Sequence, residues 1–157
     1  MGFFSNIARN LTGNWADVTL DVPDGARGES LHLLVHVNVR DEDIDVSRVV
    51  VKVRCQEHVR VPNARTTTSA PGADGTRRQS TGDATTSATL FDREVIASPA
   101  TTLEAGSSHT FDAIVELPMH VPPTIEGRNA RFEWEAYASL DMKGNDPDSG
   151  WREFRVS

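Results

Sequence analysis

The sequence contains 157 residues, 38% of them hydrophobic, and carries a formal net charge of -7. This length is enough for one domain with its own hydrophobic core. The negative charge argues against a nucleic-acid-binding protein, which normally has a basic face. No apolar run is long enough to span a bilayer, and the N-terminus lacks the pattern of a secretory signal. The single cysteine, Cys55, cannot form an internal disulfide, so we expect a cytoplasmic protein.

Residues 1–13 are predicted to form an arm or a short helix ahead of the main domain, which covers residues 14–157. The apolar side chains of this segment are spaced to lie on one side of a helix: Phe3, Phe4, Ile7 and Leu11. Such a segment either packs on the domain or docks on a partner, including a second copy of the chain. A membrane-surface helix would carry several basic residues, and only Arg9 is present. Candidate partner contacts are therefore Phe3, Phe4 and Ile7.

Apolar and polar side chains alternate along much of the chain, which predicts strands that each bury one face. The first predicted strand covers residues 15–22. Residues 29–40 show the clearest alternation, and residues 48–61 repeat it. We expect these two strands to pair as a hairpin, because consecutive antiparallel strands joined by a short loop usually do. The loop between them is acidic; we expect a solvated turn first, and second a contact for an ion or a basic partner through Asp41, Glu42, Asp43 and Asp45.

Residues 62–86 differ in composition from the rest of the chain. They are mainly Thr, Ser, Gly, Ala and Asp, and they include almost no side chain able to join a core. A structureless loop of this length is uncommon inside a compact domain, and is usually functional or disordered. We predict a flexible insertion within the domain in preference to an ordered recognition element, with Arg77 and Arg78 as candidate partner contacts.

Four more strands are predicted after the insertion. Residues 88–97 form the first, with a bulge near Asp92 and Arg93 that would restore its inward face. The next two, 111–117 and 131–140, alternate cleanly and are separated by a proline-rich connection. A closing strand follows a polar turn near the C-terminus. The total of about seven strands is typical of an all-β, immunoglobulin-like sandwich.

Metal-binding and catalytic patterns are weak in this sequence. His32 and His36 share a strand face, but at ~3.4 Å per residue they lie about 13 Å apart, too far for one zinc ion. In the segment 141–150, Lys143 stands where a calcium loop needs an oxygen ligand, and a hairpin turn explains the same residues. The usual hydrolase, nucleotide-binding and zinc-protease motifs are missing. We predict no cofactor and no enzyme activity; the alternative is a β-sandwich that binds calcium or a carbohydrate through its end loops.

A longer pattern extends over most of the chain. The run AGSSHTFDAIVELPMHVPPTIEGRNARFEWEAYASLDMKG has a strand ending in Leu-Pro, a proline corner and a strand rich in aromatic residues. The segment 40–46 before a Val-rich strand, and the opening MGFF, complete the pattern. These motifs resemble the arrestin-like superfamily, in particular its bacterial sporulation-control proteins. The resemblance does not cover the insertion, whose polar composition differs from an arrestin's receptor-probing loop at roughly the same position.

The resemblance implies an arrestin N-domain-like sandwich that acts as an adaptor or scaffold without catalysis. Family members commonly carry two sandwiches, and this sequence ends where the first would close, so functions of a cleft between two sandwiches are not implied. We predict a protein-interaction module that binds through end loops or an exposed strand edge, where unpaired backbone groups accept a strand. The partner is expected to be a protein. A second copy of the chain could bind through a strand edge or the N-terminal arm.

Overall fold

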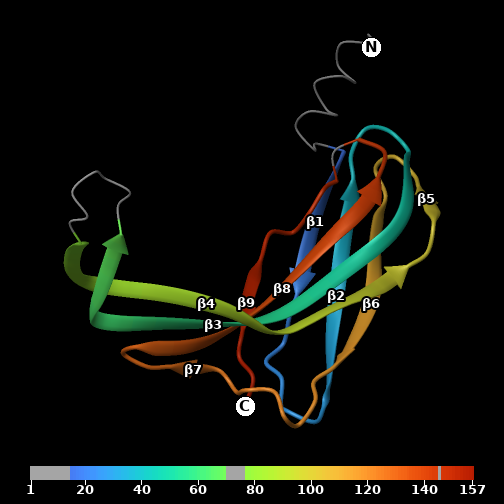
Figure 1. Ribbon diagram of the computed structural model, residues 1–157. Helices are drawn as coiled ribbons and strands as arrows, with labels where there is room; N and C mark the ends of the chain where they lie inside the picture. Colours follow the sequence, from blue (N-terminus) through green and yellow to red (C-terminus); the bar gives the residue numbers. More distant parts are fainter. Residues whose placement is uncertain (1–14, 70–76, 145) are drawn as a thin grey trace.

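The computed structural model describes residues 15–69, 77–144 and 146–157, which form a sandwich of two antiparallel β-sheets (Figure 1). This confirms the predicted all-β fold class. The predicted N-terminal arm or helix, with Phe3, Phe4 and Ile7, lies outside the described residues. The strands are β1 (Ala16–Asp21), β2 (Ser30–Val39), β3 (Ile44–Ser69), β4 (Arg77–Ser98), β5 (Thr101–Leu103), β6 (Ser108–Glu116), β7 (Ile125–Glu126), β8 (Ala130–Met142) and β9 (Arg152–Phe154). In this described part, no helix is long and apolar enough to cross a membrane.

The smaller sheet has the strand order β1-β2-β6. Its register pairs Val18 with Val37, and Leu33 with Ala113, so that apolar side chains from the three strands line one face. The members of this face are buried: Ala16, Val18, Leu20, Leu31, Leu33, Val35, Val37, Val39, Ala113 and Val115. The polar residues between them point outward, as the alternation predicts.

The larger sheet has the order β4-β3-β8-β7, with β5 also paired to β3 and β9 to β8. Trp134 is the central side chain of its inner face. Its ring lies 5.3 Å from that of Phe91 and 6.0 Å from that of Phe154, between centroids. Its indole N–H donates to the carbonyl oxygen of Pro122 at 3.0 Å, which ties the proline-rich connection to the core. Phe132 of the predicted inward row is half-buried, and the other members are buried: Val49, Val51, Val53, Cys55, Ala136, Ala138 and Leu140.

The predicted hairpin between residues 29–40 and 48–61 is wrong. β2 pairs with β1 and β6, whereas β3 pairs with β4, β5 and β8. The acidic loop therefore carries the chain from one sheet to the other. Both strands are inward-facing on one side, and that pattern fits strands opposed across a core as well as neighbours within one sheet.

The bulge predicted near Asp92 and Arg93 lies elsewhere in β4. The register with β3 shifts at Cys55/Gln56 and at Val49/Val50, which leaves Leu90 and Ala97 as the extra residues. The first shift keeps Phe91 buried and turns Leu90 outward, where 44% of it is exposed. The described residues form nine strands rather than about seven, because β5 and β7 are short pairings that the alternation does not reveal.

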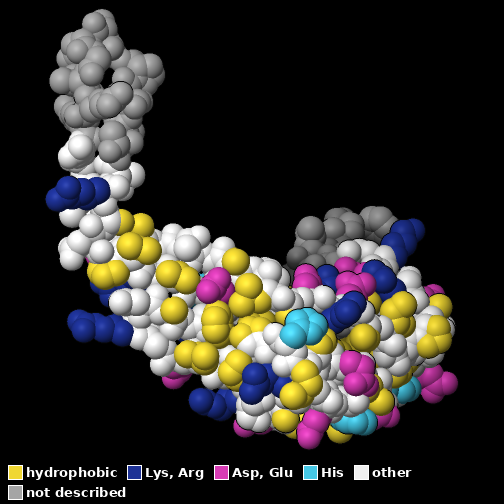
Figure 2. Space-filling view, turned by 60° about the horizontal axis from the view of Figure 1, so that its bottom comes forward, with side chains coloured by type: hydrophobic (Ala, Val, Ile, Leu, Met, Phe, Trp, Pro, Cys, Tyr) yellow, Lys and Arg dark blue, Asp and Glu magenta, His cyan; other side chains and the backbone are white. Residues whose placement is uncertain are grey.

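In the part that the structure describes, the flexible insertion predicted at residues 62–86 consists of regular strands rather than a structureless loop. β3 continues to Ser69 and β4 begins at Arg77, and the two form a ribbon paired from Ala64 with Gly82 to the ends of both strands. We call this ribbon, residues 60–69 with 77–85, the arm. It projects from the sandwich (Figures 1 and 2). No second sheet of the described chain covers the arm, so its strands need no apolar face, and a search for alternating apolar residues misses them.

Candidate functional site

The arm bends where Pro62 and Asn63 interrupt the ladder. The register passes from Val61↔Ala84 to Ala64↔Gly82, so two residues of β3 face the single residue Asp83. Asn63 adopts a φ of 54°, in the left-handed region that Asn tolerates better than most residues. A bulge of this kind turns the strand direction.

Asp83 holds this bend from the opposite strand. Its carboxylate accepts hydrogen bonds from the guanidinium of Arg60, including Nε at 2.9 Å, and from the backbone N–H of Asn63 at 3.3 Å. The bonds from Arg60, then the bond from Asn63 and the positive charge of Arg60, lower the pKa of Asp83 from its ordinary value. The carboxylate therefore stays ionised at neutral pH and connects both strands at the bend.

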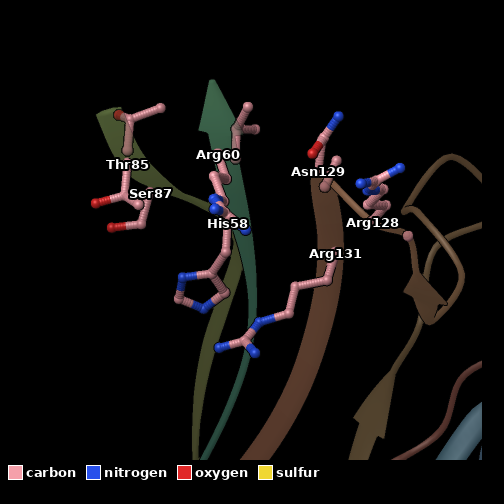
Figure 3. A pocket seen from close by; sticks show the side chains of 11 residues that line it. His58, Arg60, Thr85, Ser87, Arg128, Asn129 and Arg131 are labelled. Carbon is pink, nitrogen blue, oxygen red and sulfur yellow. The ribbon is translucent and has the colours of Figure 1, made fainter. Parts of the chain in front are cut away.

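A groove of about 460 Å³ lies at the base of the arm (Figure 3). β3 contributes His58 and Arg60, β4 contributes hydroxyl groups, and the turn between β7 and β8 closes one side. Of the described residues, eleven line the groove, and none of them is Asp or Glu. They are His58, Val59, Arg60, Thr85, Thr86, Ser87, Gly127, Arg128, Asn129, Ala130 and Arg131.

Strand pairing brings the polar side chains of the groove into two rows. In the first row His58 lies between Ser87 of β4 and Arg131 of β8. In the second, Arg60 is paired with Thr85, and its N–H donates to the carbonyl of Asn129 at 2.8 Å. Residues two apart on a strand share a face, so the two rows lie on the same side of the sheet. Figure 3 shows the side chains of His58 and Arg131 extending in the same direction from their strands.

The turn between β7 and β8 depends on Gly127. Its N–H donates to the carbonyl of Ala130 at 2.8 Å. A Cβ at this position would lie 2.7 Å from the same carbonyl oxygen, so a side chain would push the turn open. The tight turn places the exposed Arg128 beside the start of β8.

One carboxylate beside the groove lies near two of its side chains, those of Arg131 and His58. Oε2 of Glu133 lies 3.2 Å from Nε of Arg131 and 3.8 Å from Nε2 of His58. Glu133 is 23% exposed, whereas the side chain of Arg131 is 56% exposed. Arg131 therefore extends into solvent while it stays paired with the less exposed carboxylate of Glu133.

β4 leaves an open sheet edge along the groove. Within the described chain, β4 pairs with β3 alone. The N–H of Arg60 points toward β8, where it bonds Asn129, so Arg60 and Thr85 form a non-hydrogen-bonded pair. The N–H and C=O of Thr85 then point away from β3, and by alternation those of Ser87 do too. Residues 84–89 are all exposed and carry neither charge nor proline.

Two of the four acidic residues predicted as partner contacts accept hydrogen bonds within the chain. Asp43 accepts a hydrogen bond from the N–H of Ala105 at 2.8 Å, and Asp45 accepts one from the hydroxyl of Thr102 at 2.7 Å. These bonds attach the loop to β5 and to the turn that follows it. The other two predicted acidic contacts, Asp41 and Glu42, lie on the same loop.

The structure does not bring the predicted contact groups together. The acidic loop precedes the start of β3, and the arm lies at the other end of that strand. The backbones of Arg77 and Arg78 lie in β4, paired with Ser69 and Thr68. They occupy the end of the described arm, far from the acidic loop along β3.

The polar turn after β8 uses its carboxylates within the turn. Asp146 accepts a hydrogen bond from the N–H of Met142 at 3.1 Å, and Asp148 accepts one from the N–H of Gly150 at 2.8 Å. Such bonds are typical of Asp in hairpin turns. Across residues 15–69, 77–144 and 146–157, no group of three or more His, Cys, Asp or Glu side chains is arranged to hold a metal ion.

The groove could not be identified from the sequence. Its residues come from three separate segments, and their proximity depends on β3 pairing with β4 on one side and β8 on the other. One local signal existed: His58 and Arg60 are two residues apart on one face of a strand. The sequence alone could not show that Arg131 and the turn at 127–129 would lie beside them.

Comparison with known proteins gives a structural neighbour. No protein-family model and no curated protein matches the sequence. The crystal structure of Spo0M, a sporulation control protein from Bacillus subtilis, superposes with a TM-score of 0.58 at 19% sequence identity. The match covers 92% of this chain and 50% of the Spo0M chain, so this chain spans half the length of Spo0M. At this identity the likeness establishes a shared fold: the chain has a Spo0M-like β-sandwich.

Proposed function

We propose that this chain is a non-catalytic protein-interaction module of the arrestin-like type, with a regulatory role and a cytoplasmic location. The fold shared with a protein named for sporulation control supports the regulatory part of the proposal. The observation that carries it is the open edge of β4 at residues 84–89. The partner is a protein that adds a strand to this edge, and a second copy of the chain can supply that strand.

Natural sheet edges are usually protected by charges, prolines or bulges, because unpaired N–H and C=O groups accept other strands. β4 has such protection beyond both ends of the open segment. Asp83 and the bend lie on one side, and the bulge at Leu90, followed by charged residues, lies on the other. The six residues between have no protection of this kind, and six residues is about the length of an average strand. This segment therefore offers a strand-sized docking edge.

The edge is accessible because the arm and its base extend beyond the smaller sheet (Figure 1). Backbone pairing would supply affinity, and the side chains of the arm would supply selectivity. Arg77, Arg78 and the N-terminal residues Phe3, Phe4 and Ile7 remain predicted contacts.

Thr85→Pro tests the docking edge directly. The substitution removes an N–H that points away from β3, so the β3–β4 ladder keeps its hydrogen bonds, and proline is tolerated on edge strands. Thr85→Ala is the matched control, because it removes the same hydroxyl and keeps the N–H. We expect Thr85→Pro to lose specific binding and Thr85→Ala to retain it.

The readouts are quantitative mass spectrometry of proteins recovered from native lysate, and sedimentation velocity across a wide concentration range. Circular dichroism first checks that both variants fold. If folded Thr85→Pro recovers the same proteins and shows the same self-association as the parent, strand addition at this edge is wrong. Proteins recovered only when the edge N–H is present are the partners.

A further inference from the structure

We propose that the groove at the base of the arm binds a small polyanion carrying at least two oxyanion groups, phosphate or carboxylate. This inference is independent of strand addition, because it depends on the side chains of the groove rather than on the backbone edge of β4.

The lining of the groove favours negatively charged ligands. Its cationic groups are Arg60, Arg128 and Arg131, and its neutral polar groups include three hydroxyls that can donate hydrogen bonds. The whole chain, by contrast, has 23 acidic residues against 16 Lys and Arg. A groove lined by three arginines and no acid therefore departs from the charge of the rest of the molecule. Arginine binds phosphate and carboxylate through paired N–H donors.

The dimensions of the groove indicate more than one oxyanion group. The row from Ser87 through His58 to Arg131 crosses three strands, about 10 Å at the usual spacing between neighbours. One tetrahedral anion is too small to contact both ends of such a row. The volume of about 460 Å³ lies within the range of roughly 300–1,000 Å³ found for small-molecule sites. A ligand with separated oxyanions matches both observations.

We place one oxyanion group beside Arg131 and Arg128, and the other beside the β4 hydroxyls near Arg60. Glu133 already forms an ion pair with Arg131 and lies near His58, so it competes with the first oxyanion. Asp83 holds Arg60 in the same way at the other end. A ligand therefore exchanges partners with a resident carboxylate rather than meeting free cations. Removing that carboxylate while keeping its shape should strengthen binding.

Isothermal titration calorimetry of the whole chain, with pyrophosphate and with citrate at constant ionic strength, tests the proposal. We expect Arg131→Gln and Arg128→Gln each to weaken binding roughly tenfold, as for a lost charge-assisted hydrogen bond. Glu133→Gln should tighten binding several-fold. Arg93→Gln is the matched control, because Arg93 is an exposed arginine of β4 that does not line the groove. It should leave the affinity unchanged.

Each outcome decides the proposal. A preference for pyrophosphate identifies phosphate as the ligand chemistry, and a preference for citrate identifies carboxylate. The proposal is wrong if neither probe binds, if Arg93→Gln weakens binding as much as Arg131→Gln, or if Glu133→Gln leaves affinity unchanged. Circular dichroism of each variant separates a lost site from a lost fold. A failure here leaves strand addition at Thr85 intact, since Thr85→Pro and Thr85→Ala both remove the groove hydroxyl and differ at the backbone N–H.

Discussion

Trp134→Phe is the substitution whose effect on stability follows most directly from the structure. Trp134 is 1% exposed, lies between the rings of Phe91 and Phe154, and donates to the carbonyl of Pro122. Phenylalanine keeps an aromatic ring there but lacks the indole N–H and two of the buried ring carbons. The lost hydrogen bond is worth about 1 kcal/mol, and the lost burial with its cavity about 1–2 kcal/mol. We expect the free energy of unfolding to fall by about 2–3 kcal/mol.

Urea denaturation followed by far-UV circular dichroism measures this change. With a slope of roughly 2 kcal/mol per molar urea, the middle of the usual range, the midpoint should fall by about 1–1.5 M. Trp151→Phe is the matched control, because the same substitution is made on the outer face of the sheet. Trp151 is 39% exposed, with the guanidinium of Arg54 3.7 Å above its ring. Its loss should cost less than about 1 kcal/mol.

The two tryptophans thus separate a buried hydrogen-bonded ring from a surface ring. Equal shifts for Trp134→Phe and Trp151→Phe would contradict the assignment of Trp134 as the centre of the core. A change in slope rather than midpoint would mean that the variant altered the compactness of one state instead of its stability.

Two ionisable groups give further predictions. Burial first, and then the negative charge of Asp148, raise the pKa of Tyr137, the only tyrosine of the chain. A titration followed by absorbance at alkaline pH should therefore show a midpoint above the ordinary value of 10.0. Asp148→Asn should lower that midpoint. Because the pKa of Tyr137 is raised in the folded protein, the stability contributed by its protonated form is fully present below the pKa of the unfolded chain. That stability is lost as the pH rises through the folded pKa. Burial, helped by the charge of Glu57, raises the pKa of Cys55 from 9.0 to about 11. Its reaction with a thiol reagent near neutral pH should be at least about 100-fold slower in the native protein than in urea, because native thiolate is rarer by that factor; comparable rates would contradict the burial of Cys55.

The sequence predicted which face of each core strand is buried. Strict alternation identifies the inward side of a strand without any knowledge of its neighbours. Leu33, Val51 and Trp134 all lie inside as expected. The pairing of strands was harder, because inward alternation is the same whether two strands are neighbours or face each other across the core. The acidic loop after β2 therefore looked like a hairpin loop, although it connects two sheets.

The arm could not be predicted from apolar alternation, because none of its described side chains, at residues 60–66 and 79–85, is fully buried. Its threonines favour extended backbone, but β-propensity without a hydrophobic pattern also fits a loop. The groove was missed for a different reason: His58, Arg128 and Arg131 come together only through long-range pairing. The predicted contact residues Asp43 and Asp45 were visible in the sequence, yet the structure uses both for hydrogen bonds inside the molecule.

β3 belongs to the sandwich over its first part and to the arm over its last. There is therefore no linker between the two, and the orientation of the arm is transmitted by an unbroken backbone of 26 residues. From Arg60 onward the ten arm residues of β3 correspond to about 30 Å of ribbon. A partner bound along that ribbon would be held at a fixed distance and orientation relative to the sandwich. The bend at Asn63 is the position where that angle can be adjusted without disturbing the core.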